Sequence, residues 1–145
     1  MDKIVFVTGG CSGLGLATVE RLHGLGARIC VADRDESELD KLSKRFKDRL
    51  VCVVCDVSKE NDVEAAICKA VETFGTIHAA IACAGVTALT PILTTRGSID
   101  MKVFEKVLLI NLHGSMYIAK HAAIQMAKNE ASGKERGVIV LVSST

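Results

Sequence analysis

The sequence predicts an α/β fold in which a doubly wound parallel sheet carries helices on both faces. Short apolar runs of strand length alternate with longer segments of helical periodicity along the whole chain. Hydrophobic residues make up 49% of the chain and aromatic residues only 3%, so the core must consist of Val, Ile, Leu and Ala, as in buried parallel strands. Strands that alternate with helices imply right-handed crossovers, which place the strands side by side in one sheet.

The first part of the chain contains four predicted strands separated by three helices. The strands are apolar runs at residues 4–7, 28–32, 50–55 and 77–83. The first two helices are expected over 14–25 and 36–46, and the second of these carries a charged, solvent-exposed face. A third helix is expected after Ser58, which would cap it, and Glu60 and Asp62 would favour its N-terminal dipole.

The second part of the chain begins with an irregular, Thr-rich stretch over 86–98 that holds the only proline, Pro91. Loops after strand C-termini line the ligand crevice of an open parallel sheet, so this stretch is expected either beside a ligand or as an ordinary surface excursion. Helices are predicted over 101–110 and 114–129, and a fifth strand over 138–142. Since no repeat or linker interrupts this order, we expect one domain over residues 1–145, truncated after its fifth strand.

A glycine-rich turn joins the first predicted strand to the first helix. Gly9, Gly13 and Gly15 stand where the backbone must turn sharply, approach a phosphate closely and pack a helix against a strand. The rest of the predicted phosphate-binding segment is Cys11, Ser12 and Leu14. Amide groups at the N-terminus of the helix would point at the bound anion, which indicates a dinucleotide-binding, Rossmann-type site. The alternative is a tight strand-to-helix turn without a ligand.

Asp33 ends the second predicted strand, 20 residues after Gly13, where a dinucleotide fold holds a ribose hydroxyl. Its carboxylate would accept hydrogen bonds from the ribose and repel a 2′-phosphate, whereas the neighbouring Arg34 could accommodate that phosphate. No basic residue occurs from Gly10 to Ser12, so NAD is favoured over NADP. Asp33 could instead be a solvated residue at the end of a strand.

The spacing Thr-Gly-x-x-x-Gly-x-Gly and the stretch over residues 8–27 resemble the short-chain dehydrogenase/reductase family. The resemblance covers essentially the whole chain, although enzymes of this family usually run to about 250 residues as one domain. It implies an oxidoreductase that transfers a hydride between NAD and a secondary alcohol of the 3-hydroxyacyl-CoA or hydroxysteroid type. It also implies a homo-oligomer, a dimer or tetramer, formed through the helix pair over 101–129.

The resemblance further implies cofactor contacts from the segments that follow the third and fourth strands. These are Asp56 and Val57 beside the adenine ring, and Cys83, Ala84 and Gly85 beside the ribose. Ala82 and Cys83 replace two asparagines of the family pattern, which removes side-chain hydrogen bonds but leaves room for a close backbone approach. Asp56 could instead help to start the next helix.

Two residues match catalytic positions of the family. Ser144 corresponds to the serine whose hydroxyl would hydrogen-bond the substrate oxygen as its charge changes. Asn111 corresponds to an asparagine that helps to hold a water of the proton relay, or else is simply a polar residue at a helix break. The family's Tyr-x-x-x-Lys pair has no counterpart, because Lys120 follows the only tyrosine, Tyr117, at three residues. We expect that pair beyond Thr145, and a non-catalytic nucleotide-binding or interaction protein is the alternative.

Composition excludes several other classes of protein. The net charge of +1 gives no indication of a nucleic-acid partner, and no apolar run approaches the roughly 18 residues of a membrane span. Because the first strand begins almost at once, no signal or transit peptide is expected, which favours an intracellular protein of the cytoplasm or mitochondrion. Most of the six cysteines lie in apolar runs, so we expect free core thiols and no metal site. Cys52 and Cys55, three apart in a strand, would point to opposite faces.

Overall fold

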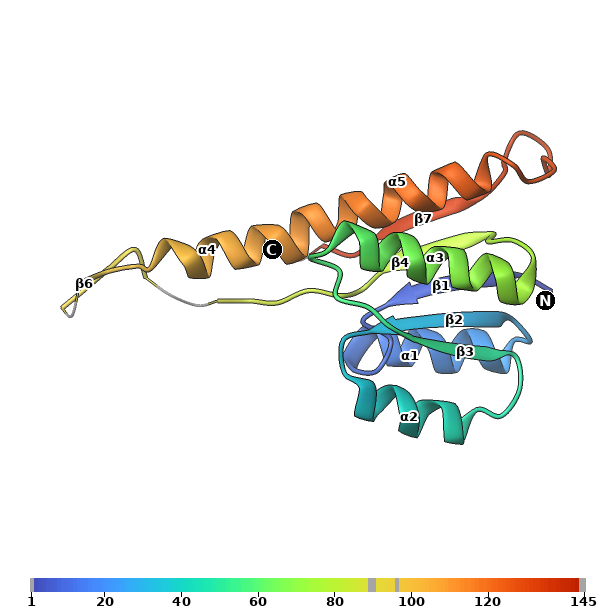
Figure 1. The fold of residues 1–145 in the computed structure, drawn as a ribbon, viewed down its shortest axis with the longest axis horizontal. Coiled ribbons are helices and arrows are strands. Elements are labelled where there is room, and N and C mark those ends of the chain that lie inside the picture. The colour runs from blue at the N-terminus through green and yellow to red at the C-terminus, as the bar shows by residue number, and fades with distance from the viewer. Residues whose placement is uncertain (1, 89–90, 96, 144–145) are drawn as a thin grey trace.

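A computed structural model describes residues 2–88, 91–95 and 97–143. Five parallel strands form its main sheet in the order β3-β2-β1-β4-β7 (Figure 1). The strands are β1 (Ile4–Thr8), β2 (Arg28–Asp33), β3 (Leu50–Val54), β4 (Ala79–Ala82) and β7 (Val138–Leu141). The chain winds outward from β1 in one direction to β3 and in the other to β7, so the prediction of a doubly wound parallel sheet is confirmed.

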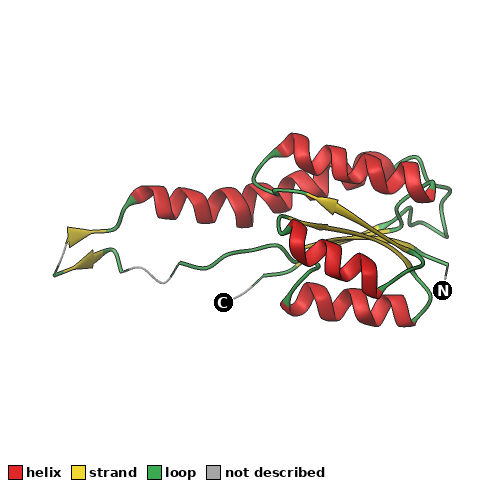
Figure 2. Cartoon of the chain, turned by 60° about the horizontal axis from the view of Figure 1, so that its bottom comes forward, coloured by secondary structure: helices red, strands yellow, loops and turns green. Residues whose placement is uncertain are grey.

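Helices cover both faces of this sheet, as Figure 2 shows. On one face α1 (Gly13–Gly24) and α2 (Glu36–Arg45) pack on a cluster that includes Val5 and Val7. On the other face α3 (Glu60–Phe74) and α5 (Gly114–Met126) pack around Phe6, the largest fully buried side chain. Because successive strand residues point to opposite faces, β1 contributes to both cores at once.

Residues 86–88, 91–95 and 97–98, with the helix that follows them, form an arm beyond the strand ends (Figures 1 and 2). The arm carries a short antiparallel hairpin, β5 (Leu93–Thr94) with β6 (Gly97–Ser98), and then α4 (Met101–Leu108). Ile92 and Leu93 on the hairpin are exposed, as are Met101 and Phe104 on α4. The arm therefore presents apolar side chains that the sheet does not cover.

The predicted helix break at Asn111 is wrong. A π-helical turn, η1 (Leu109–His113), joins α4 to α5, and the residues at both of its ends keep right-handed helical conformations. The Asn111 side chain bonds the backbone of Val86 instead of interrupting its own helix. The helix therefore continues through Asn111, and the wider π turn aims this side chain out of the helix.

The prediction that Ser58 caps the third helix is also wrong. Helix α3 begins at Glu60, Lys59 occupies its N-cap position, and no side chain caps the turn. The Ser58 hydroxyl donates instead to the Asp56 carboxylate at 2.7 Å, a local hydrogen bond that forms outside the helix. No helix in the described part of the chain combines the length and the apolar character needed to cross a bilayer.

Candidate functional site

A cleft of about 320 Å³ lies at the C-terminal edge of the sheet, where the strand order changes direction between β1 and β4. Crevices at this position are the usual ligand sites of open parallel sheets. Every residue predicted to bind the cofactor lines this cleft except Cys11. The lining residues that the sequence prediction missed are Ala32, Cys55, Val86 and Ile110. They carry no polar signal in the sequence, so only the packing of the strands, of the loop after β4 and of η1 brings them to this place.

The glycine turn leads from β1 into the N-terminus of α1. A Cβ on Gly9 would lie 2.7 Å from the backbone nitrogen of Ala84, and one on Gly15 would lie 2.0 Å from the carbonyl oxygen of Gly9. Gly13 has a φ of +51°, a left-handed conformation, and nothing lies within 4 Å of its missing side chain. The first amides of a helix lack partners within it, so the N-terminus of α1 offers donors to an anion in the cleft.

Asp33 ties the end of β2 to the glycine turn. Its Oδ2 accepts the backbone N–H of Cys11 at 3.1 Å, and its Oδ1 accepts that of Asp35 at 3.2 Å. The Cys11 side chain packs against the core cluster on the α1 and α2 face and does not line the cleft. Burial, with the negative charge of Asp33, raises the pKa of the Cys11 thiol to about 12, so this group stays protonated at neutral pH.

Asp56 and Val57 form the wall of the cleft that follows β3. The hydrogen bond from the Ser58 hydroxyl holds the pKa of Asp56 below its usual range, and the Ser58 backbone N–H adds to this at 3.0 Å. Val57 packs closely on the start of α5, because a Cβ on Gly114 would lie 3.0 Å from Val57 Cγ2. The cleft therefore has an ionised carboxylate on this wall beside a firmly packed backbone.

The segment after β4 is held without the asparagines of the family pattern. The Asn111 side chain accepts the N–H of Val86 at 2.9 Å and donates to the Val86 carbonyl at 2.8 Å. Thr8, which the sequence prediction overlooked, accepts the N–H of Ala84 at 3.4 Å through its fully buried hydroxyl. The sequence could have indicated this role, because Thr8 lies at the end of the first strand, beside the glycine turn. Together these bonds position Ala84 and Gly85 against the glycine turn.

Among the described residues considered for acid–base chemistry, Tyr117 and Lys120 lie away from the cleft. Ser144 lies outside the described residues, although Val142 still pairs with Ala82 at 3.1 Å as the chain leaves β7. Tyr117 packs against the core, with its ring edge-on to His113, and Lys120 donates to Glu60 on α3 at 2.7 Å. Neither Tyr117 nor Lys120 lines the cleft.

All six cysteines are free. Cys52 packs with the cluster under α1 and α2 and Cys55 belongs to the cluster on the opposite face, which confirms that the two thiols point apart. Within the described residues, no three His, Cys, Asp or Glu side chains come together as ligands for a metal ion.

Comparisons with known proteins agree with this geometry. The model of the short chain dehydrogenase family matches residues 3–145. The 3-hydroxyacyl-CoA dehydrogenase type-2 of Homo sapiens is 36% identical over 144 residues, which cover 97% of this chain and 55% of that protein. The diacetyl reductase [(S)-acetoin forming] of Staphylococcus epidermidis is 34% identical over 92% of this chain and 52% of its own length.

Among solved structures, gox2181 superposes with a TM-score of 0.83 and 29% identity, covering 99% of this chain and 54% of that one. The chain thus spans about half the length of the relatives that it matches. Because the family model covers nearly every residue and the cleft has the geometry described above, the chain belongs to the short chain dehydrogenase family.

Proposed function

We propose that this chain is the NAD-binding half of an oxidoreductase that transfers a hydride between NAD and a secondary alcohol of the 3-hydroxyacyl-CoA or hydroxysteroid type. The observation that carries the proposal is the cleft, in which the N-terminus of α1 and the carboxylate of Asp33 lie on one edge of the sheet. Relatives named as a dehydrogenase and a reductase support the reaction class.

The residues present fit a dinucleotide. Gly9 and Gly15 lie where any Cβ would collide with backbone atoms, and the missing side chain of Gly13 leaves room for a phosphate at the turn. Asp33 uses each carboxylate oxygen for one backbone bond, and each oxygen keeps a lone pair for a ribose hydroxyl. When bound, NAD supplies the acceptor for the hydride. Asp56 would accept a hydrogen bond from the adenine amino group, and Val57 and Ile110 would cover the ring.

The catalytic part of the proposal rests on fewer residues. Ser144 would hydrogen-bond the substrate oxygen, and Asn111 would help to hold a water of the proton relay. A tyrosine tuned by a lysine is needed to take the hydroxyl proton near neutral pH, since an unperturbed tyrosine titrates near pH 10. The sequence holds no Tyr-x-x-x-Lys, so we propose that the 145 residues alone bind NAD without turnover.

The test measures both properties on the same preparation. We expect calorimetry to detect NAD binding, and NADH absorbance to show no oxidation of a 3-hydroxyacyl thioester or a hydroxysteroid by the 145-residue chain. Measurable turnover free of contaminating enzyme would show that the relay is complete without the missing pair. A failure to bind NAD would overturn the cofactor assignment itself.

A non-catalytic nucleotide-binding or interaction protein is the second candidate. It is favoured by the position of Tyr117 and Lys120, which are engaged in packing and an ion pair away from the cleft. A coding sequence that continues past Thr145 into a Tyr-x-x-x-Lys motif would exclude this candidate. One that stops at Thr145 would favour it.

A homo-oligomer also belongs to the proposal, as does a location in the cytoplasm or mitochondrion. Along η1 and α5 one side is buried against the body, whereas α4 (Met101–Leu108) has no buried residue, and the exposed side of this continuous helix carries Leu108, Leu109, Leu112 and Met116. An apolar stripe on both sides of a helix implies two packing partners. Sedimentation of the full-length protein at micromolar concentration should show a dimer or tetramer, and a clean monomer would contradict this.

A further inference from the structure

The segment that joins β3 to α3 carries Asp56 and Val57, and the first turn of α3 folds back onto it. Asp62, on that first turn, accepts the backbone N–H of Asp56 through its Oδ2 at 3.2 Å. In the same segment the Asp56 carbonyl accepts the Lys59 N–H at 2.9 Å, and the Lys59 carbonyl accepts the Asp62 N–H at 3.1 Å. These bonds close a ring through Asp56, Lys59 and Asp62, in which the Asp62 carboxylate supplies the contact that secondary structure does not.

The residues on either side of Asp56 are fixed by other parts of the fold. The Cys55 N–H donates to the carbonyl of Asp33 at 2.8 Å, and Cys55 and Val57 are buried in the core cluster under α3 and α5. Asp56 lies between them on the wall of the cleft. Within residues 2–88, 91–95 and 97–143, the Asp62 carboxylate is the sole partner of the Asp56 N–H. Loss of that carboxylate would leave a partly buried donor without a protein acceptor and allow this residue to shift.

The Asp56 carboxylate keeps one oxygen for a ligand. Its Oδ1 accepts both the backbone N–H and the hydroxyl of Ser58, at 3.0 and 2.7 Å, whereas no donor from the described residues reaches its Oδ2. The Ser58 bonds fix the direction of the carboxylate relative to its own backbone. The bond to Asp62 fixes that backbone relative to the rest of the cleft. The position of Oδ2 therefore depends on Asp62, although Asp62 itself does not line the cleft.

Stabilisation of the helix N-terminus is the simplest alternative role for Asp62, because acidic residues in a first turn interact favourably with the helix dipole. Glu60 lies in the same turn and provides the comparison: its Oε1 accepts from Lys120 at 2.7 Å and lies 3.1 Å from Nε2 of His121. Glu60 thus connects α3 to α5, whereas Asp62 connects α3 to the wall of the cleft. Two acids at one helix end therefore have different partners, and Asp62 is the one that bonds a residue of the cleft.

We propose that Asp62 is a positioning residue for the adenine base, which acts by holding the Asp56 backbone so that Asp56 Oδ2 meets the adenine amino group. The proposal rests on the proposed function, which places adenine beside Asp56 and Val57. A carboxylate distinguishes a base that offers an N–H from one that does not only when it is held at hydrogen-bond distance. Asp62 therefore governs how strongly the cleft prefers adenine to a base without the amino group.

The experiment compares NAD with nicotinamide hypoxanthine dinucleotide, in which a carbonyl replaces the adenine amino group. Calorimetry on the 145-residue chain should show about tenfold tighter binding of NAD. In Asp62→Ala that preference should fall below about twofold, whereas Asp62→Asn, which keeps an acceptor oxygen, should retain most of it. Asp62→Leu keeps a branched side chain without an acceptor and should repeat the result of Asp62→Ala. The matched control, Glu60→Ala, removes an acid from the same turn and should lower stability but keep the preference.

A measurement without ligand separates this proposal from the cofactor assignment. Hydrogen exchange at the Asp56 amide, followed by NMR, should quicken far more in Asp62→Ala than in Glu60→Ala. An unchanged preference in Asp62→Ala would overturn the proposal, and so would equal losses in Asp62→Asn or in Glu60→Ala. If the unsubstituted chain does not bind NAD but the Asp56 amide responds as expected, the cofactor assignment fails, and Asp62 keeps its role in holding Asp56 but not its link to adenine.

Discussion

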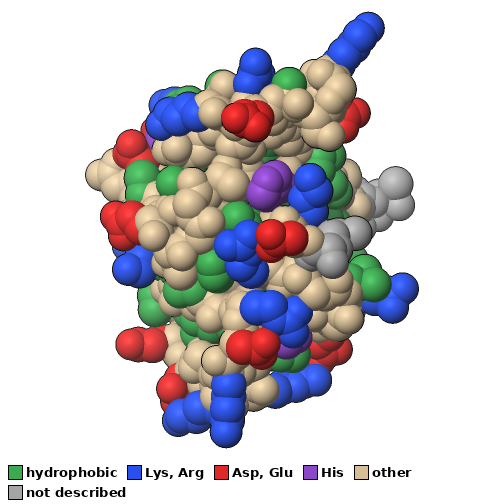
Figure 3. Space-filling view, turned by 90° about the vertical axis from the view of Figure 1, so that its right-hand side faces the viewer, with side chains coloured by type: hydrophobic (Ala, Val, Ile, Leu, Met, Phe, Trp, Pro, Cys, Tyr) green, Lys and Arg blue, Asp and Glu red, His purple; other side chains and the backbone are tan. Residues whose placement is uncertain are grey.

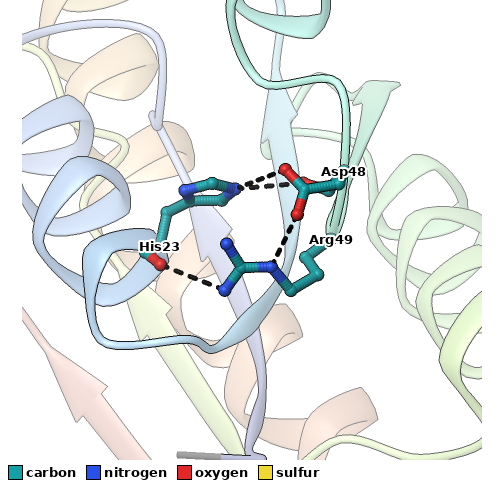
Figure 4. A network of polar contacts seen from close by, with 3 residues as sticks. All are labelled: His23, Asp48 and Arg49. Carbon is teal, nitrogen blue, oxygen red and sulfur yellow. Dashed lines mark hydrogen bonds and ion pairs between the residues drawn. The ribbon is translucent and has the colours of Figure 1, made fainter.

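The two edges of the parallel sheet differ in whether their charged side chains and backbone groups are paired. At the N-terminal edge, shown facing the viewer in Figure 3, basic and acidic side chains lie interspersed. His23, Asp48 and Arg49 illustrate this in Figure 4: Asp48 accepts from Arg49 at 2.9 Å and lies 3.6 Å from the His23 ring, and Arg49 also donates to the His23 carbonyl. At the C-terminal edge Arg34 forms no ion pair among the described residues, and the first amides of α1 face a cleft.

Two asparagines, Asn129 and Asn111, show the same difference between the edges in their hydrogen bonds. Asn129, at the N-terminal edge, donates to the carbonyls of Ile77 and Arg136, each at 2.8 Å, and accepts from Thr76. Within the described part of the chain, the Asn111 side chain bonds only the backbone of Val86, a residue that lines the cleft. Asn129 therefore satisfies polar groups inside the fold, whereas Asn111 fixes the backbone of a segment that lines the cleft. We infer that the N-terminal edge serves stability and the C-terminal edge serves binding.

The largest effect is expected from Gly15→Ala. The new Cβ would lie 2.0 Å from the Gly9 carbonyl oxygen, and backbone cannot move aside as a side chain can. We expect a loss of about 3 kcal/mol or more in the free energy of unfolding, together with loss of NAD binding. Gly24→Ala, in the same helix with nothing within 4 Å, is the matched control and should gain up to about 1 kcal/mol. Urea denaturation of both variants measures the difference, and equal losses would contradict a special role for Gly15.

This contrast also shows what the sequence could predict. Strands and helices were located correctly to within a few residues because each carries its own apolar period. The spacing of the glycines also indicated their roles, since Gly9 and Gly15 lie where a Cβ would collide and Gly13 has a left-handed φ. Features that depend on distant partners were missed. The π turn reflects Asn111 bonding Val86, 25 residues away. No local pattern encodes this arrangement.

A second substitution tests the binding edge alone. Asp33→Ala removes a ribose acceptor and a charge that repels a 2′-phosphate, so we expect NAD affinity to fall about tenfold or more. Discrimination against NADP should relax at the same time. Asp33→Asn, which keeps the size and one acceptor oxygen, should lose less NAD affinity but a similar share of the discrimination. Calorimetric titration with both dinucleotides checks this, and tighter binding of NADP than NAD by the unsubstituted chain would contradict the assigned role of Asp33.

The two asparagines provide the third test. Asn129→Ala leaves two carbonyls and a hydroxyl without their partner, so we expect a loss of about 1–3 kcal/mol in unfolding free energy and unchanged NAD affinity. Asn111→Ala should cost about 0.5–1.5 kcal/mol, because Val86 is more exposed to water, yet weaken NAD binding several-fold. The opposite assignment, with binding lost only in Asn129→Ala, would refute the division of roles between the edges.

The smallest effect concerns pH and belongs to the N-terminal edge. His78 Nδ1 accepts the backbone N–H of Ile4 at 3.0 Å, and burial, with the charges of Lys3 and Arg28, lowers the pKa of His78. The folded state therefore binds this proton less tightly than the unfolded state. The stabilisation is complete above the ordinary histidine pKa of about 6.5 and is lost as pH falls through the lower folded value.

Urea denaturation at several pH values below 6.5 would reveal this slope, and His78→Gln should reduce it. NAD binding at the C-terminal edge should not show the same pH dependence as stability. The lowered pKa of Asp56 keeps that carboxylate ionised through this window, so NAD affinity should change little while stability declines. An unchanged slope in His78→Gln would assign the pH dependence to other groups. A parallel fall in NAD affinity would show that the two edges of the sheet are coupled.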